Sequence, residues 1–74
     1  MDIKIRFFAT LREGRGKEII EQHAEGTTVM DVINKHTIAL EDVAILLING
    51  RDGNINQLLK DGDIISIFPP VGGG

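Results

Sequence analysis

Apolar and charged residues alternate at the start of the chain, from Ile3 to Phe7. A period of two sends successive side chains to opposite faces of an extended segment, so this pattern predicts a half-buried β-strand. Two glycines flank Arg15 and predict a turn. A second strand is predicted over 17–23, where two adjacent isoleucines supply the apolar content but alternation is poor. Together these segments predict a first hairpin.

The pattern changes to a helical period in the middle of the chain. Thr28 and Asp31 have the spacing of a capping box, which predicts the start of a helix. The helix is expected to be short and to end near His36 or Thr37, with a connector over 38–42. Its predicted buried face carries residues at i, i+3, i+4 and i+7, namely Val29, Val32, Ile33 and His36.

Two further strands are predicted in the second half of the chain. The apolar run 43–48 has the length and β-branched content of a buried central strand. Asn49-Gly50 predicts a type I′ turn after it. A second turn is predicted at 61–63 and a last strand over 64–68. Pro69-Pro70 ends that strand because proline has no N–H to donate to a β-ladder.

The order of these elements is strand, strand, helix, strand, short irregular segment, strand. Two early strands, one helix and two late strands predict an α+β fold of the ubiquitin-like β-grasp type, a mixed sheet packed on one main helix. A chain of 74 residues is expected to form one domain with a small core. We assign this domain to residues 1–68 and an extended, flexible C-terminal glycine tail to 69–74.

Composition narrows the classes of function. The net charge of −3 does not suggest a nucleic-acid partner. The chain has no cysteine, which excludes disulfides, cysteine-based metal sites and a thiol nucleophile of its own. No segment has the apolar length of a signal peptide or a membrane span, so we expect no membrane association and a cytoplasmic location.

The tail carries the most distinctive chemistry. Glycine lacks a Cβ, so the run Gly72-Gly73-Gly74 is thin enough to enter a narrow active site. Its only distinctive group is the carboxylate of Gly74, which is a poor electrophile until it is activated. The tail therefore looks like a substrate for another enzyme's chemistry. The ordinary alternative is a disordered chain end without a function.

Three motifs lie in a recognisable order along the whole chain. They are Phe7-Phe8-Ala9-Thr10-Leu11-Arg12-Glu13, Asp61-Gly62-Asp63 before an apolar strand, and Pro69-Pro70-Val71 with a final Gly73-Gly74. The chain thereby resembles the MoaD/ThiS family of sulfur carriers, and most closely the MoaD branch, the small subunit of molybdopterin synthase.

The resemblance implies a non-catalytic carrier that binds no cofactor itself. A ubiquitin-activating-type adenylyltransferase, similar to MoeB, would use ATP to adenylate Gly74. Sulfur from a persulfide donor would then replace AMP to give a thiocarboxylate. The tail would enter a MoaE-like large subunit of molybdopterin synthase and donate its sulfur to a pterin precursor. The inserting residues would be Pro69, Pro70, Val71, Gly72 and Gly73.

Other interpretations stay open at this point. Gly72 stands where other residues are common in the MoaD branch, and it also suits thiamine-type sulfur carriers. The same tail would serve a ubiquitin-like modifier that is conjugated to lysines through Gly74. Phe68, Phe8 and Arg12 are predicted to bind partners, while their ordinary roles are closure of the sheet edge, packing under a loop and a solvated charge.

No metal site is expected. Asp61 and Asp63 are interpreted as turn residues, since two carboxylates around one glycine fall short of a full cation cage. His23 and His36 are separated in the sequence and have no cysteine near them, so neither is assigned a metal-binding or catalytic role.

Overall fold

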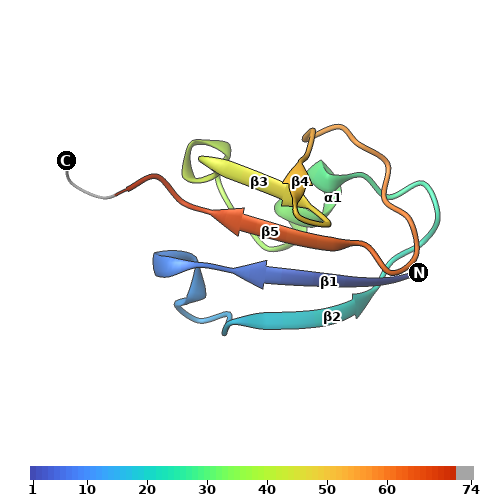
Figure 1. Cartoon of the computed structure of the whole chain (residues 1–74). Coiled ribbons are helices and arrows are strands. Elements are labelled where there is room, and N and C mark those ends of the chain that lie inside the picture. Colours follow the sequence, from blue (N-terminus) through green and yellow to red (C-terminus); the bar gives the residue numbers. More distant parts are fainter. Residues whose placement is uncertain (72–74) are drawn as a thin grey trace.

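The computed structural model describes residues 1–71 and forms a mixed five-stranded sheet with one α-helix across it (Figure 1). The sheet order is β2-β1-β5-β3-β4, in which β1 and β5 are parallel and the other neighbours antiparallel. This is the ubiquitin-like β-grasp arrangement that the order of elements predicted. The elements are β1 (Asp2–Phe7), η1 (Ala9–Arg12), β2 (Glu18–Gln22), α1 (Val29–Lys35), η2 (Leu40–Asp42), β3 (Ile45–Ile48), β4 (Arg51–Asp52) and β5 (Ile64–Phe68).

The core lies between the sheet and α1. Alternate residues of β1 and β5 point inward, and the apolar stripe of α1 covers them. The side chains with the least exposure are Ile3, Ile5, Phe7, Val29, Val32, Ile33, Ile65 and Ile67, each at most 1% exposed. The period of two and the helical period found in the sequence therefore select these core residues, except that His36, predicted on the same helical face, is half-buried and lies outside the core.

The helix α1 has a well-defined boundary at each end. The Thr28 hydroxyl accepts a hydrogen bond from the Asp31 amide and the Asp31 carboxylate accepts one from the Thr28 amide, which confirms the predicted capping box. At the other end Ile38 N–H donates to Ile33 O at 3.1 Å, and Thr37 N–H donates to Asn34 O at 3.0 Å. These two bonds form a Schellman motif, in which Thr37 adopts a positive φ of 56°.

The prediction of a buried central strand at 43–48 was wrong in its position. The strand, β3, is shorter, and the central strand of the sheet is β5. Outside β3 lies only the two-residue β4, and Ile45 is 51% exposed. The apolar run concealed this because both faces of β3 carry apolar side chains, one facing the core and one facing out.

The turn between β3 and β4 and the turn that precedes β5 meet at the first residue of β5. Asn49 and Gly50 both have positive φ, which agrees with the predicted type I′ turn between β3 and β4. The Asn49 amide donates to Asp63 Oδ1 at 2.9 Å and its oxygen accepts from Ile64 N–H at 2.9 Å. Asp63 also accepts from Lys60 N–H at 2.7 Å. Asp63 therefore closes a turn, as predicted, and links the hairpin to the first residue of β5.

In the part of the chain that the structure describes, no helix has the length and apolarity needed to cross a bilayer. The strand β5 ends at Phe68, and the chain leaves it at the end of the sheet opposite the N-terminus (Figure 1). The division into a domain at 1–68 and a tail at 69–74 stays a prediction.

Candidate functional site

The root of the C-terminal tail lies at the end of the central strand. Phe68, the last residue of β5, pairs in register with Ile45 of β3. Its carbonyl accepts a hydrogen bond from Ala44 N–H at 2.9 Å. The base of the tail is therefore held by the backbone of the sheet rather than by a loose connection.

Two aromatic rings stack at this root. Phe7 and Ile67 are partners in the parallel β1–β5 register and both face the core. Because side chains alternate along a strand, the next residues, Phe8 and Phe68, lie side by side on the outer face. Their ring centroids are 4.0 Å apart and their planes differ by 14°. Both rings are half-buried, so the stack closes the sheet edge and still presents aromatic surface.

Arginine side chains flank the stack. Arg12 Nε–H donates to the Phe7 carbonyl at 2.9 Å, and its guanidinium carbon lies 5.4 Å from the centroid of the Phe8 ring. Arg6 lies 5.8 Å from the same centroid and also pairs with Glu18 at 3.9 Å. Both distances fall within the range of cation–π attraction. The structure thus brings together the three residues predicted to bind partners, Phe8, Phe68 and Arg12.

Ile45 extends this surface and was missed as a surface residue in the sequence. Directly paired residues of neighbouring strands share a face, so Ile45 lies beside Phe68 on the outside of the sheet. We call Phe8, Phe68 and Ile45 the apolar strip. No sequence signal could have identified Ile45 as a surface residue, because the run 43–48 contains no polar residue to mark the solvent face.

The tail leaves the strip along two prolines. Pro69 is half-buried, Pro70 is exposed, and Val71 is 97% exposed. Each proline fixes φ near −65°, so this segment is a stiff spacer. The predicted reactive residue, Gly74, and the predicted inserting residues Gly72 and Gly73 lie outside the described residues.

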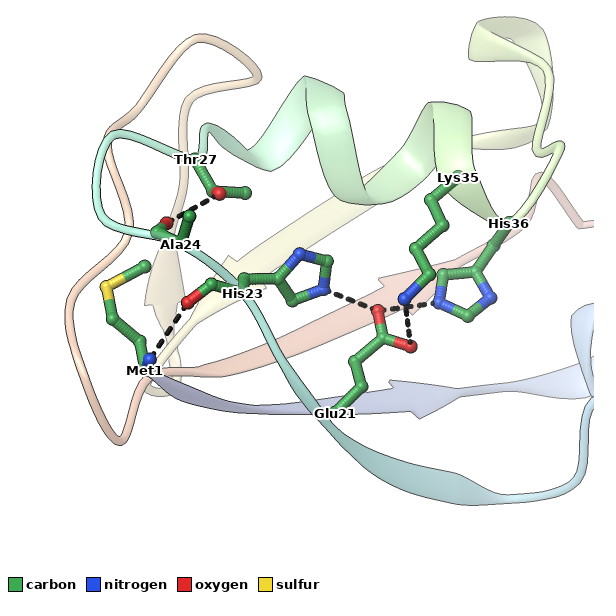
Figure 2. Close-up of polar contacts among 7 residues, drawn as sticks. All are labelled: Met1, Glu21, His23, Ala24, Thr27, Lys35 and His36. Carbon is green, nitrogen blue, oxygen red and sulfur yellow. Dashed lines mark hydrogen bonds and ion pairs between the residues drawn. The ribbon is translucent and has the colours of Figure 1, made fainter.

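Away from the apolar strip, a cluster of polar side chains joins β2 to the C-terminal end of α1 (Figure 2). Glu21 Oε1 lies 2.6 Å from His23 Nε2 and 2.9 Å from His36 Nε2, and its Oε2 lies 3.3 Å from Lys35 Nζ. The side chains of Glu21, His23 and His36 are only 10–15% exposed. The two histidines are far apart in the sequence. His23 lies two residues from Glu21, on the same side of the extended chain, whereas the packing of α1 against β2 brings His36 to the same carboxylate.

The electrostatics of this cluster favour an ionised carboxylate. Burial would raise the pKa of Glu21, but hydrogen bonds from His36, His23 and Lys35 outweigh it and hold the pKa below its ordinary value of 4.5. Within residues 1–71, no group of three or more histidine, aspartate or glutamate side chains has an arrangement that could hold a metal ion. Its contacts with His36 and Lys35 make Glu21 the centre of a polar link between β2 and the end of α1.

Known proteins resemble the chain over its whole length. The ThiS family model matches residues 5–74. The chain is 36% identical to the molybdopterin synthase sulfur carrier subunit of Escherichia coli, over 97% of this chain and 99% of that protein. It is 35% identical to small archaeal modifier protein 3 of Haloferax volcanii, over 100% of both.

A solved structure also shows a relative together with a second protein. It is the complex of subunits 1 and 2 of the molybdopterin-converting factor from Helicobacter pylori. The chain superimposes on the matching chain of that complex with a TM-score of 0.65 and 26% identity, covering 100% of both.

Proposed function

The chain belongs to the ThiS family of sulfur carriers, and from that premise we propose that it is the sulfur-carrier subunit of a molybdopterin synthase. The main observation behind this proposal is the root of the tail. A stiff Pro69-Pro70 spacer leaves the centre of the sheet beside the apolar strip. That arrangement suits a tail that enters a partner's active site while the strip contacts the partner's surface.

In this proposal the chain supplies a reacting carboxylate and no catalytic acid or base. The Gly74 carboxylate attacks the α-phosphate of ATP in an adenylyltransferase, which releases pyrophosphate and leaves an acyl-adenylate. The terminal sulfur of a persulfide donor then attacks the acyl carbon and displaces AMP, which gives an acyl disulfide. A thiol of the donor system cleaves the S–S bond of this intermediate, which releases the thiocarboxylate and leaves the donor as a disulfide. AMP supplies the leaving group that a free carboxylate lacks, and the carrier contributes no reacting group other than its own terminal carboxylate.

Two partners follow from this proposal. An adenylyltransferase similar to MoeB would receive the carboxylate, and a MoaE-like large subunit would receive the thiocarboxylate. The two-subunit Helicobacter pylori complex supports a partner of the second kind. Aromatic side chains are frequent anchors at the centre of protein interfaces, so Phe8 and Phe68 are the expected anchors, with Arg12 beside them.

The intact mass of the protein, purified gently from its native host, tests the sulfur chemistry. We expect a species heavier by one exchange of oxygen for sulfur, with the change localised to Gly74. A discharged carrier would show only the carboxylate. The second arm therefore supplies activating enzyme, ATP and a sulfide source, and no mass shift in that arm would overturn the proposal. Deletion of Gly73 and Gly74 is the matched control and must abolish the shift.

A second candidate function is a protein modifier joined to lysines through Gly74. The observation that favours it is the 35% identity to small archaeal modifier protein 3 over the whole chain. Activation by adenylation is common to both functions, so only the acceptor separates them. Glycine remnants of this tail on lysines of cellular proteins would support the modifier, and their absence would leave the carrier.

Gly72 also keeps a thiamine-type sulfur carrier under consideration. Affinity purification distinguishes that pathway from the proposed one. Recovery of a molybdopterin synthase large subunit with the chain supports our proposal. Recovery of a thiazole synthase without the large subunit would transfer the same carrier chemistry to thiamine synthesis.

A further inference from the structure

The aromatic stack has a second consequence besides forming a surface. Phe8 belongs to the segment that follows β1, whereas Phe68 is the last residue of β5. Their rings contact at 4.0 Å, so the stack ties the final side chain of the sheet to a neighbouring segment. Phe68 is also fixed on its other side, where its carbonyl accepts from Ala44 N–H. The direction of the chain at Phe68 is therefore constrained from both sides.

The next two residues carry that direction outward. Proline fixes φ and favours an extended conformation, so two prolines form a short, stiff rod. A rotation of the chain at Phe68 would swing Val71, whereas a flexible residue at Pro69 or Pro70 would absorb it. The direction of the backbone at Phe68 consequently determines where the chain points at the end of the rod.

Arg12 holds the other half of the stack. Its Nε–H bond to the Phe7 carbonyl fixes the guanidinium beside the peptide that precedes Phe8. From there the guanidinium lies near the Phe8 ring, at 5.4 Å from its centroid. Ala9, with a positive φ of 51°, turns the chain away into η1 and allows Arg12 to return to this position.

We propose that Phe8, Phe68 and Arg12 form a clamp that fixes the direction in which the tail leaves the sheet. Phe8 and Arg12 then act as positioning residues for the start of the tail up to Val71, in addition to any contact they make with a partner. The effect on chemistry rests on the proposed function, whereas the effect on tail direction does not. The experiments below separate the two.

The first experiment measures the direction of the tail in the free protein by nuclear magnetic resonance. The Val71 N–H residual dipolar coupling is compared with that of Ile67 in wild type, Phe8→Leu and Phe8→Tyr. Leucine keeps apolar volume but lacks a flat ring, whereas tyrosine keeps the ring. We expect the Val71 coupling to shrink in Phe8→Leu and to be retained in Phe8→Tyr. Unchanged Val71 coupling in Phe8→Leu would overturn the clamp, with the Ile67 coupling reporting that the sheet is intact.

Arg12→Lys provides an independent variant in the same experiment. Lysine keeps the charge but loses the planar group and the Nε–H donor, so we expect a smaller Val71 coupling. Arg51→Lys is the matched control, because Arg51 is exposed on β4 and makes no part of the clamp. Equal couplings in the Arg12 and Arg51 variants would remove Arg12 from the proposal.

The second experiment measures adenylation by the activating enzyme. A misdirected tail lowers kcat, whereas a lost surface contact that is equal in ground and transition states raises KM alone. We expect Phe8→Leu to lower kcat about tenfold, with recovery in Phe8→Tyr. A rise in KM with unchanged kcat would overturn the positioning role. If even the wild-type protein is not adenylated, the proposed function fails, and the Val71 coupling still decides whether the clamp exists.

Discussion

At the scale of single residues, the Glu21 cluster shows how packing creates chemistry from ordinary side chains. One carboxylate oxygen accepts from two imidazoles that come from different elements, and the other oxygen pairs with Lys35. A partly buried carboxylate is costly unless it is hydrogen-bonded, and this one has three partners. Removing the carboxylate would leave the two imidazoles and Lys35 without their charged hydrogen-bond acceptor. The loss in the free energy of unfolding should therefore exceed that of a surface substitution.

The first prediction follows from the lowered pKa of Glu21. A carboxyl with a lower pKa in the folded than in the unfolded state stabilises the fold while it is ionised. This stabilisation is complete above the unfolded pKa of about 4.5 and disappears as pH falls through the folded-state value. We therefore expect Glu21→Gln to lower the free energy of unfolding by about 1–3 kcal/mol near pH 7, and by progressively less below about pH 4.5.

Urea unfolding across this pH range checks the prediction. Glu25→Gln is the matched control, since Glu25 is exposed, and we expect it to change stability by less than about 0.5 kcal/mol. A cost of Glu21→Gln that is the same at every pH would mean that its ionisation does not contribute to stability.

Sequence reasoning worked for some residues and failed for others for an identifiable reason. Given a parallel pairing of the first and last strands, alternation alone sends Phe8 and Phe68 to one face. The approach of His36 to Glu21 and His23 depends instead on how α1 lies across β2. The spacing of two between Glu21 and His23 is a local signal, but no spacing in the sequence encodes the distance to His36, which follows a helix with a different period.

At the scale of elements, the C-terminal end of α1 contains a local conflict. The Schellman motif requires a residue with positive φ at position 37, where glycine is the usual choice. Threonine is β-branched, and a positive φ is strained for such a residue. The conformation persists because the motif's hydrogen bonds and the buried Ile38 side chain hold it in place.

The second prediction is that Thr37→Gly stabilises the protein. Glycine relieves the left-handed strain of about 1–2 kcal/mol but loses about 0.5–1 kcal/mol in backbone entropy, so the net gain should lie between about 0 and 1.5 kcal/mol. Thermal and urea unfolding measure it. Thr37→Ala is the comparison, because alanine keeps a Cβ and should gain less. A loss of stability in Thr37→Gly would show that the threonine side chain has a compensating role.

The third prediction concerns the link between the β3–β4 turn and β5. Asn49→Gly preserves the positive φ of the turn but removes both side-chain hydrogen bonds, to Asp63 and to Ile64 N–H. Asp63 is 8% exposed, so its oxygen would lose a partner in a partly desolvated place. We expect a loss of about 1–3 kcal/mol in urea unfolding. A neutral result would assign Asn49 to turn conformation alone, and Asn56→Gly on the exposed loop is the comparison.

The elements themselves were largely predictable, and the exception has a physical cause. Capping residues, turn residues and the helical period are local signals, and they located α1 and the turns at 49–50 and 61–63 correctly. The position of β3 within the sheet is not determined by local signals. Its apolar residues on both faces, including the exposed Ile45, predict a fully buried strand. The only strand beyond it is the two-residue edge strand β4.

At the scale of the whole molecule, the body and the tail have different physical tasks. The body buries its core between sheet and helix, and its last well-packed outer contact is the stack at Phe68. Pro70 and Val71 are exposed and add little to that core. Changes in tail length should therefore alter reach without altering stability, which gives a test that separates function from folding.

The last prediction uses this separation. One glycine inserted between Pro70 and Val71 displaces the Gly74 carboxylate by up to about 3.5 Å along the chain. Reactions of bound groups depend steeply on position, and a 1 Å displacement can cost about a hundredfold. We therefore expect the rates of adenylation and of thiocarboxylate formation, followed by intact mass, to fall at least tenfold, with the thermal unfolding midpoint unchanged.

A glycine inserted after Glu25, in the exposed loop that follows β2, is the length-matched control and should leave the rate of thiocarboxylate formation unchanged. If the variant with the longer tail formed the thiocarboxylate as fast as wild type, the reaction would not depend on the distance from the sheet to the carboxylate. The fixed root of the tail would then have a role other than setting that distance.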